Sequence, residues 1–566
     1  MDFQLVVLTS VMGTVAWASG IVRDGQPQVP KLDLALLSLD NLYRFLLLFT
    51  AQYVVAKLYR VVVYPHFLSP LRHLPGPKDN HPFFGQFIKI LLDPSPIGLH
   101  KKWHSQWPHA PFIRYLGLFN EETLIINTPE AHKEVLQTHC YSFVKPSQLY
   151  RMVGDITGMG LLFSEGDIHK RQRRVLITLF TLPALKKILP VFQDSTERMA
   201  RFLEDQLDQD GRVVIDTVDS FSKVALDIAG KALMGVELDS LANPRSDLDF
   251  RASFHRTLQP PPLSAIISFI NTAVPVRRWI PLEANTGYIR ATQNLRRMMR
   301  VVIDERVQQY RECKQRGDVF ESPALRGVGR DVLTLMVEES AASKGDDGLG
   351  ADEMVDQVLT LLAGGHESSA TALTWCMYAL ATRPEMQERI RGELKGLGRG
   401  AGGRYDYWGG VETLPFLHNF LREVMRRWSP IVLSLREPVE DVTICGTFIP
   451  KGTVIVFNPS QVNLCRAIWG DDAEEFRPER WETLKGEAAS PYALETFSNG
   501  PRICVGKSFA YMEIKCVLVD ILTRFRVLPT PEVARYGLED PPLKNPSMMV
   551  VPKGGLNVVL ERLGEW

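Results

Sequence analysis

The sequence predicts a mainly α-helical protein with small β-sheets, attached to an apolar N-terminal segment. Three observations indicate this fold class. Apolar residues recur with helical spacing through most of the chain after residue 128, short alternating runs are confined to a few places, and residues 3–22 carry no charged side chain. A helical globular body behind an apolar anchor is therefore expected.

The composition is that of an ordinary globular protein. The 566 residues include 65 basic and 65 acidic side chains, so the formal net charge is zero, and 45% of the residues are hydrophobic. This balance excludes disordered, collagen-like and coiled-coil proteins. Because proteins that coat nucleic acid carry a basic excess, no nucleic-acid partner is expected. The seven cysteines include no CxxC pair and are too few for a disulfide scaffold of this size.

Two apolar segments near the N-terminus indicate a membrane. Phe3 to Val22 is uncharged and long enough to cross a hydrocarbon core of roughly 30 Å. Its acidic start differs from the positive start of a secretory signal, so we expect a retained anchor. The second segment, Leu42 to Val63, is interrupted by charged residues and is either a second span or an interfacial helix. A proline-rich hinge over residues 65–77 then leads to the body.

Periodicity assigns the elements of the body. The predicted helices cover residues 128–137, 168–180, 185–207, 215–234, 286–314, 352–382, 384–394 and 414–428. Short β-like runs are predicted at 111–115, 123–126, 442–444, 454–457 and 556–560. An α-rich body with small sheets follows from this pattern.

A cysteine in a glycine-rich loop is the strongest chemical signal. Residues 497–506 read F-x-x-G-x-R-x-C-x-G, and an apolar helical segment follows from 507 to 525. Gly500 and Gly506 permit a backbone close to a flat macrocycle, and the helix after Cys504 directs N–H groups at the sulfur, which lowers the pKa of its thiol. Arg502 can pair with a haem propionate, and Phe497 can shield the sulfur from water. A structural buried cysteine is the alternative, but so many fixed positions favour haem-iron ligation by Cys504.

This loop resembles the haem-binding signature of the cytochrome P450 family, and other segments resemble that family in the same order. Glu423 and Arg426 are similar to its ExxR pair, whose positions share one helix face. Arg480 resembles the arginine that completes a Glu–Arg–Arg network. The resemblance covers roughly residues 65 to 566 and implies the single-domain P450 fold. It implies an anchor over 1–64, a hinge over 65–77 and a haem-thiolate monooxygenase domain over 78–566.

A glycine pair lies within the longest predicted helix. Residues 363–369 read A-G-G-H-E-S-S, and two helical glycines cost about 2 kcal/mol relative to alanine. The glycines serve either close helix packing or a locally widened groove. The segment resembles the family's oxygen-binding motif, which implies that Gly364 and Gly365 border dioxygen while Glu367 and Ser368 deliver protons. Ser368 stands where the family usually has threonine and lacks the methyl group that fixes the rotamer. His366 is expected to pack or hydrogen-bond rather than ligate iron.

Further cations match positions that meet the haem propionates in the family. His169 stands where the family has tryptophan and shares a helix face with Arg173, and Arg436 matches the arginine that follows the ExxR helix. The resemblance implies that these residues contact the cofactor. Three neighbouring cations point elsewhere and are either a docking patch for an acidic reductase or a solvated charge run: Lys170, Arg171 and Arg174.

The resemblance implies a haem b enzyme that oxidises a lipophilic small molecule with O2 and with electrons from NADPH, supplied by an NADPH-cytochrome reductase. The predicted pocket walls are largely apolar and rich in methionine: residues 152–159, 359–364, 431–433 and 547–549. The N-terminus is similar to that of microsomal, fungal specialised-metabolism members. This implies the endoplasmic reticulum membrane, a catalytic domain facing the cytosol, and a terpenoid, alkaloid or polyketide substrate. Two alternatives are a haem-thiolate isomerase or dehydratase that needs no reductase, and a non-catalytic haem-binding protein.

Overall fold

The chain forms two units, each described by itself. The computed structural model describes residues 10–11, 14, 39–241, 250–258, 261–273, 276–320, 330–343, 348–398 and 404–564. The first unit comprises residues up to Ile90 together with Arg114–Leu124, and the second comprises Leu91–Ile113 and Ile125 onward. Apart from three positions, the predicted anchor Phe3 to Val22 lies outside the described residues, so it stays a prediction.

One apolar helix dominates the first unit. Helix α2 (Leu39–Leu58) has Asp40 in its first turn and Lys57 in its last, as the helix dipole favours. The π-helical η2 (Tyr59–Leu68) continues it, and the short η3 (Pro70–His73) follows. Leu39–Leu68 spans 30 residues and contains an 18-residue window with a mean hydropathy of 1.5, and it is the one unbroken helix of the described chain that is long and apolar enough to cross a membrane. A helix of this length is compatible with both predicted roles of the second apolar segment, a membrane span and an interfacial helix.

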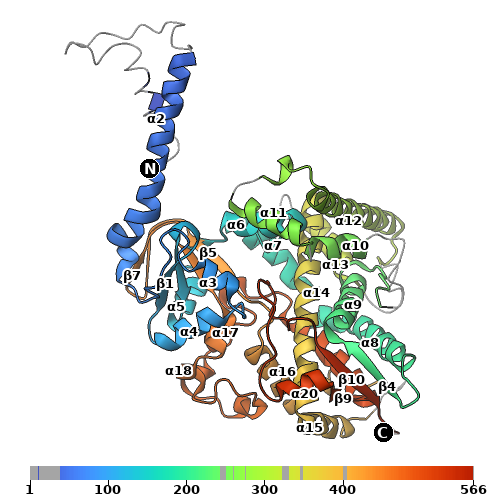
Figure 1. Cartoon of the computed structure of the whole chain (residues 1–566). Helices are drawn as coiled ribbons and strands as arrows, with labels where there is room; N and C mark the ends of the chain where they lie inside the picture. Colours follow the sequence, from blue (N-terminus) through green and yellow to red (C-terminus); the bar gives the residue numbers. More distant parts are fainter. Residues whose placement is uncertain are drawn as a thin grey trace, which may run out of the picture. The chain divides into compact units, whose positions relative to one another are not determined.

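Helices make up most of the second unit (Figure 1). Every helix predicted from periodicity is present, with each end within three residues of the expected position. These helices are α5 (Pro129–Lys133) continued by η5 (Glu134–Thr138), α7 (Gly166–Leu179), α8 (Leu182–Glu204), α9 (Thr217–Ala229) continued by η7 (Gly230–Met234), α12 (Glu283–Arg316), α14 (Ala351–Thr382), α15 (Pro384–Lys395), α16 (Pro415–Arg427) and α19 (Lys507–Arg524).

Periodicity missed several shorter helices. They span four to twelve residues, so each contains few repeats of the 3.6-residue pattern. The missed helices are α3 (Phe87–Leu92), α4 (Gly98–Gln106), α6 (Ser147–Thr157), α10 (Phe250–Leu258), α11 (Pro262–Ala273), α13 (Val332–Ala342), α17 (Pro459–Asn463), α18 (Arg466–Trp469) and α20 (Pro531–Tyr536).

The strands form three small sheets. Their bounds are β1 (Phe112–Leu116), β2 (Glu122–Ile126), β3 (Phe143–Val144), β4 (Arg212–Asp216), β5 (Ser434–Pro438), β6 (Val442–Ile444), β7 (Thr447–Ile449), β8 (Val454–Phe457), β9 (Phe525–Pro529) and β10 (Asn557–Arg562). The strand orders are β1-β2-β8-β5-β3, β4-β10-β9 and β6-β7. Strand β10 is antiparallel to both neighbours, with Leu560 opposite Val213 on one side and Val527 on the other.

The predicted start of the helix at 215 is wrong. Ile215 belongs to strand β4, and helix α9 begins only at Thr217. The Asp216 side chain accepts hydrogen bonds from the backbone N–H groups of Val218 and Asp219 at 2.9 and 3.3 Å. This N-cap satisfies the first free donors of the helix and separates strand from helix.

Helix α14 passes through the second unit beside α9, α12 and α16 and is drawn in yellow in Figure 1. Nearly every residue in its second half is buried. Trp375 stacks on Trp428 with ring centroids 5.1 Å apart, which ties α14 to the end of α16. The helix ends at Arg383, because the following Pro384 disfavours helical backbone in the residue before it. A long, firmly packed helix therefore carries the segment around Gly364.

Candidate functional site

The loop from 497 to 506 places Cys504 at the start of α19. Gly500 has φ +70°, and a Cβ there would collide with the carbonyl oxygen of Leu136, so only glycine fits. Gly506 has an ordinary φ of −86°, so the positive backbone angle is confined to Gly500. The backbone N–H of Cys504 donates to the carbonyl oxygen of Phe497 at 2.9 Å. This bond closes the loop and fixes Cys504 just before the helix.

The Cys504 thiol is enclosed by protein yet keeps an exposed surface, so its sulfur faces an open space. Burial raises the pKa of the Cys504 thiol, and the Gly506 backbone and the charges of Arg173 and Lys507 only partly oppose this. The sequence predicts that the start of α19 lowers the pKa of the Cys504 thiol. For the protein groups around the sulfur this prediction is wrong, because desolvation outweighs the helix dipole. A thiolate here needs a cation directly at the sulfur. The described residues contain no cluster of three His, Cys, Asp or Glu side chains suited to a metal.

Buried arginines and a histidine gather beside the cysteine loop, and the histidine is uncharged at neutral pH. Arg436 and His169 are 7% and 2% exposed, and the Arg502 side chain is 4% exposed. Burial and then the Arg502 charge lower the pKa of His169 to about 3 and that of Arg436 to about 10. Arg502 forms an ion pair with Glu165 and donates to the Ser164 carbonyl oxygen at 3.2 Å. Arg173 lies close enough to interact with the charges of both Cys504 and Arg502.

Lys145 belongs to this cluster, although sequence reasoning missed it. Its side chain is 7% exposed, and its Nζ lies 3.8 Å from Glu165. Burial, together with Arg436 and Arg502, holds the pKa of Lys145 well below its usual range. The available signal was a lysine between Val144 and Pro146 in a short apolar run. Two buried side chains, Arg502 and Lys145, thus share Glu165 as their carboxylate partner, so the cluster has room for further negative charge.

The glycine pair of α14 borders open space. A Cβ built at Gly364 or Gly365 would meet no atom within 4 Å, and Gly364 is exposed although it sits in mid-helix. Close packing at the glycines is therefore excluded. The predicted widening is also absent, because α14 is continuous α-helix here. The Ser368 hydroxyl donates to the Gly364 carbonyl oxygen at 2.6 Å, and Glu367 is partly buried.

His366 points away from the open space into the packed interior. It is 3% exposed, its Nε2 lies 3.0 Å from the Ser222 hydroxyl of α9, and its ring meets Phe254 edge to face. The expectation of a packing and hydrogen-bonding residue agrees with this geometry.

The structure brings Glu423, Arg426 and Arg480 together in a fully buried network. Glu423 accepts from Arg426 at 2.9 and 2.8 Å, from Arg480 Nε at 2.8 Å and from Trp481 Nε1 at 3.0 Å. Arg426 also donates to backbone carbonyl oxygens, including that of Ala473 at 2.6 Å. Every charge in the network has a partner, which is the condition under which buried ions are tolerated. The network ties α16 to the segment that precedes the cysteine loop.

The predicted docking patch on α7 is only partly available. Lys170 pairs with Asp167 at 2.8 Å on the surface. Arg171 forms a partly exposed ion pair with Glu353 of α14 and donates to the Gly348 carbonyl oxygen at 2.8 Å, so it is less free than Lys170 and Arg174. Arg174 is exposed. The docking role of all three cations stays a prediction, and Arg171 keeps 24% of its side chain exposed.

A cavity of about 600 Å³ lies beside the cysteine loop and is lined by Phe497, Ile503 and Lys507. Arg422 also lines it, with its guanidinium 3.8 Å from the centre of the Trp481 ring. Burial lowers the pKa of both Arg422 and Lys507. The cavity wall is thus aromatic and cationic.

The predicted pocket walls are brought together in two pairs, 152–159 with 359–364 and 431–433 with 547–549. Thr360 of α14 donates to the Thr157 carbonyl oxygen of α6 at 3.3 Å. Ile431 and Met549 form an antiparallel bridge. Apolar side chains from three of the four predicted segments remain substantially exposed: Met152, Met159, Leu433 and Met548. Leu359 and Leu362 are fully buried and face the core.

Comparison with known proteins identifies the family. A cytochrome P450 family model matches residues 75–557. The cytochrome P450 monooxygenase FUM15 of Gibberella moniliformis is 32% identical over 523 residues, covering 82% of this chain and 84% of that protein. The cytochrome P450 monooxygenase sphH of Aspergillus fumigatus is 31% identical over 498 residues, covering 85% and 87%. The cytochrome P450 monooxygenase FSL4 of Gibberella zeae is 27% identical over 583 residues and covers 99% of both chains. With its cysteine loop, its buried Glu–Arg–Arg network and this match over most of its length, the chain belongs to the cytochrome P450 family and is a monooxygenase of fungal type.

Proposed function

We propose that this chain is a membrane-anchored haem-thiolate monooxygenase that oxidises a lipophilic small molecule. The observation that carries the proposal is a lone exposed thiol at the start of α19, beside buried cations that outnumber their carboxylate partner. The family implies haem b, and these residues fit it. The Cys504 sulfur would ligate the iron, whose charge would hold the thiolate form. The cations, including Arg173, Arg436 and Arg502, would hold the two propionates, with His169 and Lys145 beside them.

When bound, haem supplies activation of dioxygen and insertion of one oxygen atom into the substrate. The chain's own residues provide room, protons and exclusion of water. Gly364 and Gly365 leave space beside α14 for dioxygen. The Ser368 hydroxyl donates to the Gly364 carbonyl oxygen at 2.6 Å. From this position the hydroxyl can pass on a proton that the carboxyl group of the neighbouring residue Glu367 donates. Phe497, packed on Tyr511 with ring centroids 5.5 Å apart, shields the cysteine side from water.

The substrate is lipophilic. Exposed methionine and leucine side chains on the pocket walls offer an adaptable apolar surface and no fixed charge that would anchor a carboxylate. The fungal monooxygenases that this chain resembles support a role in secondary metabolism, with a terpenoid, alkaloid or polyketide as substrate. Expression with a reductase in a fungal or yeast host, followed by metabolite profiling, identifies the compound that gains oxygen.

Electrons come from NADPH through a cytochrome reductase. Lys170 and Arg174 on α7 remain candidates for docking it, and the cationic cavity at Arg422 and Lys507 offers a second surface next to the cysteine loop. We place the anchor at residues 1–64, the hinge at 65–77 and the catalytic domain at 78–566, with the domain on the cytosolic side of the endoplasmic reticulum membrane. The 30-residue helix Leu39–Leu68 supports a membrane location.

The test is turnover in microsomes with and without NADPH. The proposal predicts that product forms only with NADPH and reductase, and that Ser368→Ala lowers product per NADPH while releasing more hydrogen peroxide. Product formed equally without NADPH would favour an isomerase or dehydratase instead. Normal coupling in Ser368→Ala would remove the hydroxyl from proton delivery.

A further inference from the structure

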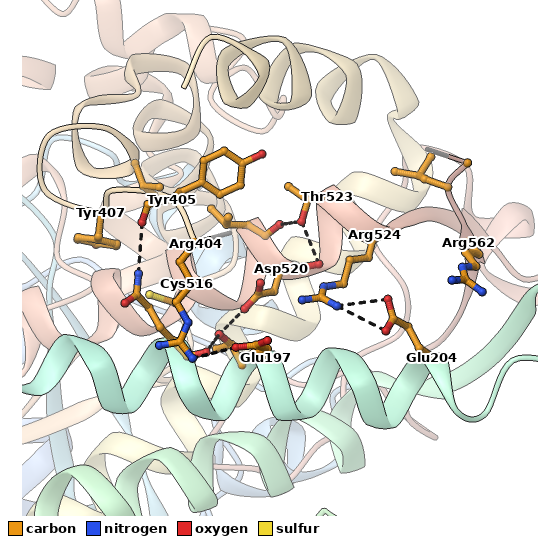
Figure 2. Close-up of a pocket in the computed structure, with 16 residues that line it drawn as sticks. Glu197, Glu204, Arg404, Tyr405, Tyr407, Cys516, Asp520, Thr523, Arg524 and Arg562 are labelled. Carbon is orange, nitrogen blue, oxygen red and sulfur yellow. Dashed lines mark hydrogen bonds and ion pairs between the residues drawn. The ribbon is translucent and has the colours of Figure 1, made fainter. Parts of the chain in front are cut away.

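Charged groups near α19 differ in how completely they are paired. In the wall of a polar cavity of about 780 Å³ between α8 and α19, drawn in Figure 2, Arg404 pairs with Glu197 at 2.8 Å. In the same wall, Arg524 pairs with Glu204 at 3.3 Å. At the cysteine loop, by contrast, two buried basic side chains share one carboxylate, that of Glu165. The cluster at the cysteine loop therefore keeps donors for an added anion.

Tyr141 lies beside this cluster, although no motif includes it. It belongs to the short helix η6 (Cys140–Ser142), and its hydroxyl oxygen lies 3.3 Å from Nδ1 of His169 on α7. Two cations contact its ring: the Lys170 ammonium is 4.7 Å and the Arg502 guanidinium 5.4 Å from the ring centroid. Because cations are attracted to the face of an aromatic ring, these contacts hold the Tyr141 hydroxyl at His169.

The contact with Tyr141 decides which nitrogen of His169 carries the hydrogen. The His169 ring is 2% exposed and uncharged at neutral pH, so only one of its two nitrogens is protonated. An imidazole nitrogen is more basic than a phenol oxygen, so the Tyr141 hydroxyl donates and Nδ1 accepts. An accepting Nδ1 leaves the hydrogen on Nε2. Within the described parts of the chain this Nε2–H has no hydrogen-bond partner, so it can donate to a ligand.

A donor at this position corresponds to the tryptophan that the family usually has in place of His169. The ring N–H of tryptophan can only donate. A neutral histidine offers a donor at Nε2 in one of its two forms, whereas the other form presents a lone pair that a carboxylate repels. His169 therefore needs a hydrogen-bond donor at its Nδ1 if it is to bind an anion as tryptophan would.

We propose that Tyr141 is a positioning residue for haem, because its hydroxyl keeps His169 in the form whose Nε2–H donates to a propionate. The inference rests on the proposed function for the identity of the anion. Tyr141 acts through His169. No atom is transferred and no electron moves, since the hydroxyl only selects between two forms of the same ring.

The rate of haem transfer from the full chain to apomyoglobin tests this role. Tyr141→Phe keeps the ring and its cation contacts and removes only the hydroxyl. It should speed the transfer by about threefold to tenfold, because part of a hydrogen bond to a charged group is lost. In a His169→Trp chain, whose ring N–H needs no partner, the same change should alter the rate by less than about 1.5-fold. Tyr536→Phe is the matched control, since its hydroxyl meets Glu532 at 3.4 Å on the exposed surface of α20.

An equal acceleration by Tyr141→Phe in both chains would overturn the proposal, because it would show a packing effect that does not pass through His169. An unchanged rate in the single variant would overturn it as well. The melting temperature of each variant shows whether it folds. If the His169→Trp chain does not hold haem, His169→Gln replaces it, because the side-chain amide always carries an N–H.

The nitrogen-15 spectrum of the full chain, labelled at its 12 histidines and recorded in the solid state, reports the two forms directly. The signals of His169 are those absent from His169→Trp. The proposal predicts a hydrogen on Nε2 and a bare Nδ1 in wild type, and a larger share of the opposite form in Tyr141→Phe. A hydrogen on Nδ1 in wild type would contradict it. If no thiolate-ligated carbon-monoxide complex forms, the proposed function fails, while the spectrum of the haem-free chain still decides the role of Tyr141.

Discussion

Replacing Glu423 with glutamine should destabilise the fold measurably. The Glu423 carboxylate binds Arg426 and Arg480 at 2.8–2.9 Å, and neither it nor Arg426 has any exposed side-chain surface. Glu423→Gln keeps the shape but removes the negative charge, so buried Arg426 loses the carboxylate it pairs with, and Arg480 keeps only the longer pair with Asp472 at 3.4 Å. Breaking a buried ion pair in this way costs about 3–5 kcal/mol.

This free energy converts into a shift of the melting temperature. The unfolding entropy of globular proteins is about 2.1 cal/mol/K per residue, which over 566 residues amounts to about 1.2 kcal/mol/K. A loss of about 3–5 kcal/mol therefore lowers Tm by about 2.5–4 °C.

Differential scanning calorimetry of the full chain in detergent measures this shift. Glu479→Gln is the matched control, since Glu479 and its partner Arg389 keep 38% and 47% of their side chains exposed. Such a surface pair contributes about 0–1 kcal/mol, so the control should melt within about 1 °C of wild type. A Glu423→Gln variant that also melts within this range would refute the claim that the carboxylate neutralises the two arginines.

Three further predictions concern the cofactor side and the core. Gly364→Leu should fold with an unchanged or higher Tm, since no atom lies within 4 Å of the new Cβ. Its side chain fills the space beside α14, so the variant should lose turnover. Full turnover in the variant would contradict this. Arg436→Gln should speed transfer of haem to apomyoglobin by about tenfold or more, because a charge-assisted bond to a propionate is lost, whereas exposed Arg174→Gln should not. Glu495→Gln tests how the protonation of Glu495 changes stability with pH. Burial raises the pKa of Glu495 to about 8, so the folded chain holds a proton that the unfolded chain releases above about pH 4.5. The Tm of the variant minus that of wild type should therefore grow from pH 5 to about pH 8 and then level off; a constant difference contradicts this.

Much of the fold and the motif-bearing part of the site could be predicted, because those features are local. Helix α14 was predicted at 352–382 and spans Ala351–Thr382, and the cysteine loop carries its chemistry within ten residues. Glu423 and Arg426 are three residues apart on one helix, so their pairing follows from helix geometry alone. The start of α9 was misjudged, because the apolar residues of β4 extend the helical pattern without a break.

The rest depends on contacts between distant residues, which no local pattern contains. Arg171 looked like part of a surface patch, but it pairs with Glu353, 182 positions away. Lys145 lies outside every motif and joins the cation cluster only in the folded chain. The pKa of the Cys504 thiol was predicted in the wrong direction, because desolvation depends on everything packed around the loop. The Glu513–Ser369 bond likewise joins two helices that are separated in sequence.

The central claim is that Cys504 is the thiolate ligand of a haem iron. It is tested most directly by the absorption spectrum of the carbon-monoxide complex of the reduced full chain, recorded for wild type and for Cys504→Ala. The account predicts the strongly red-shifted Soret band of a thiolate-ligated haem in wild type and its loss in the variant. An unshifted band in wild type, or a shifted band that survives in Cys504→Ala, would contradict it.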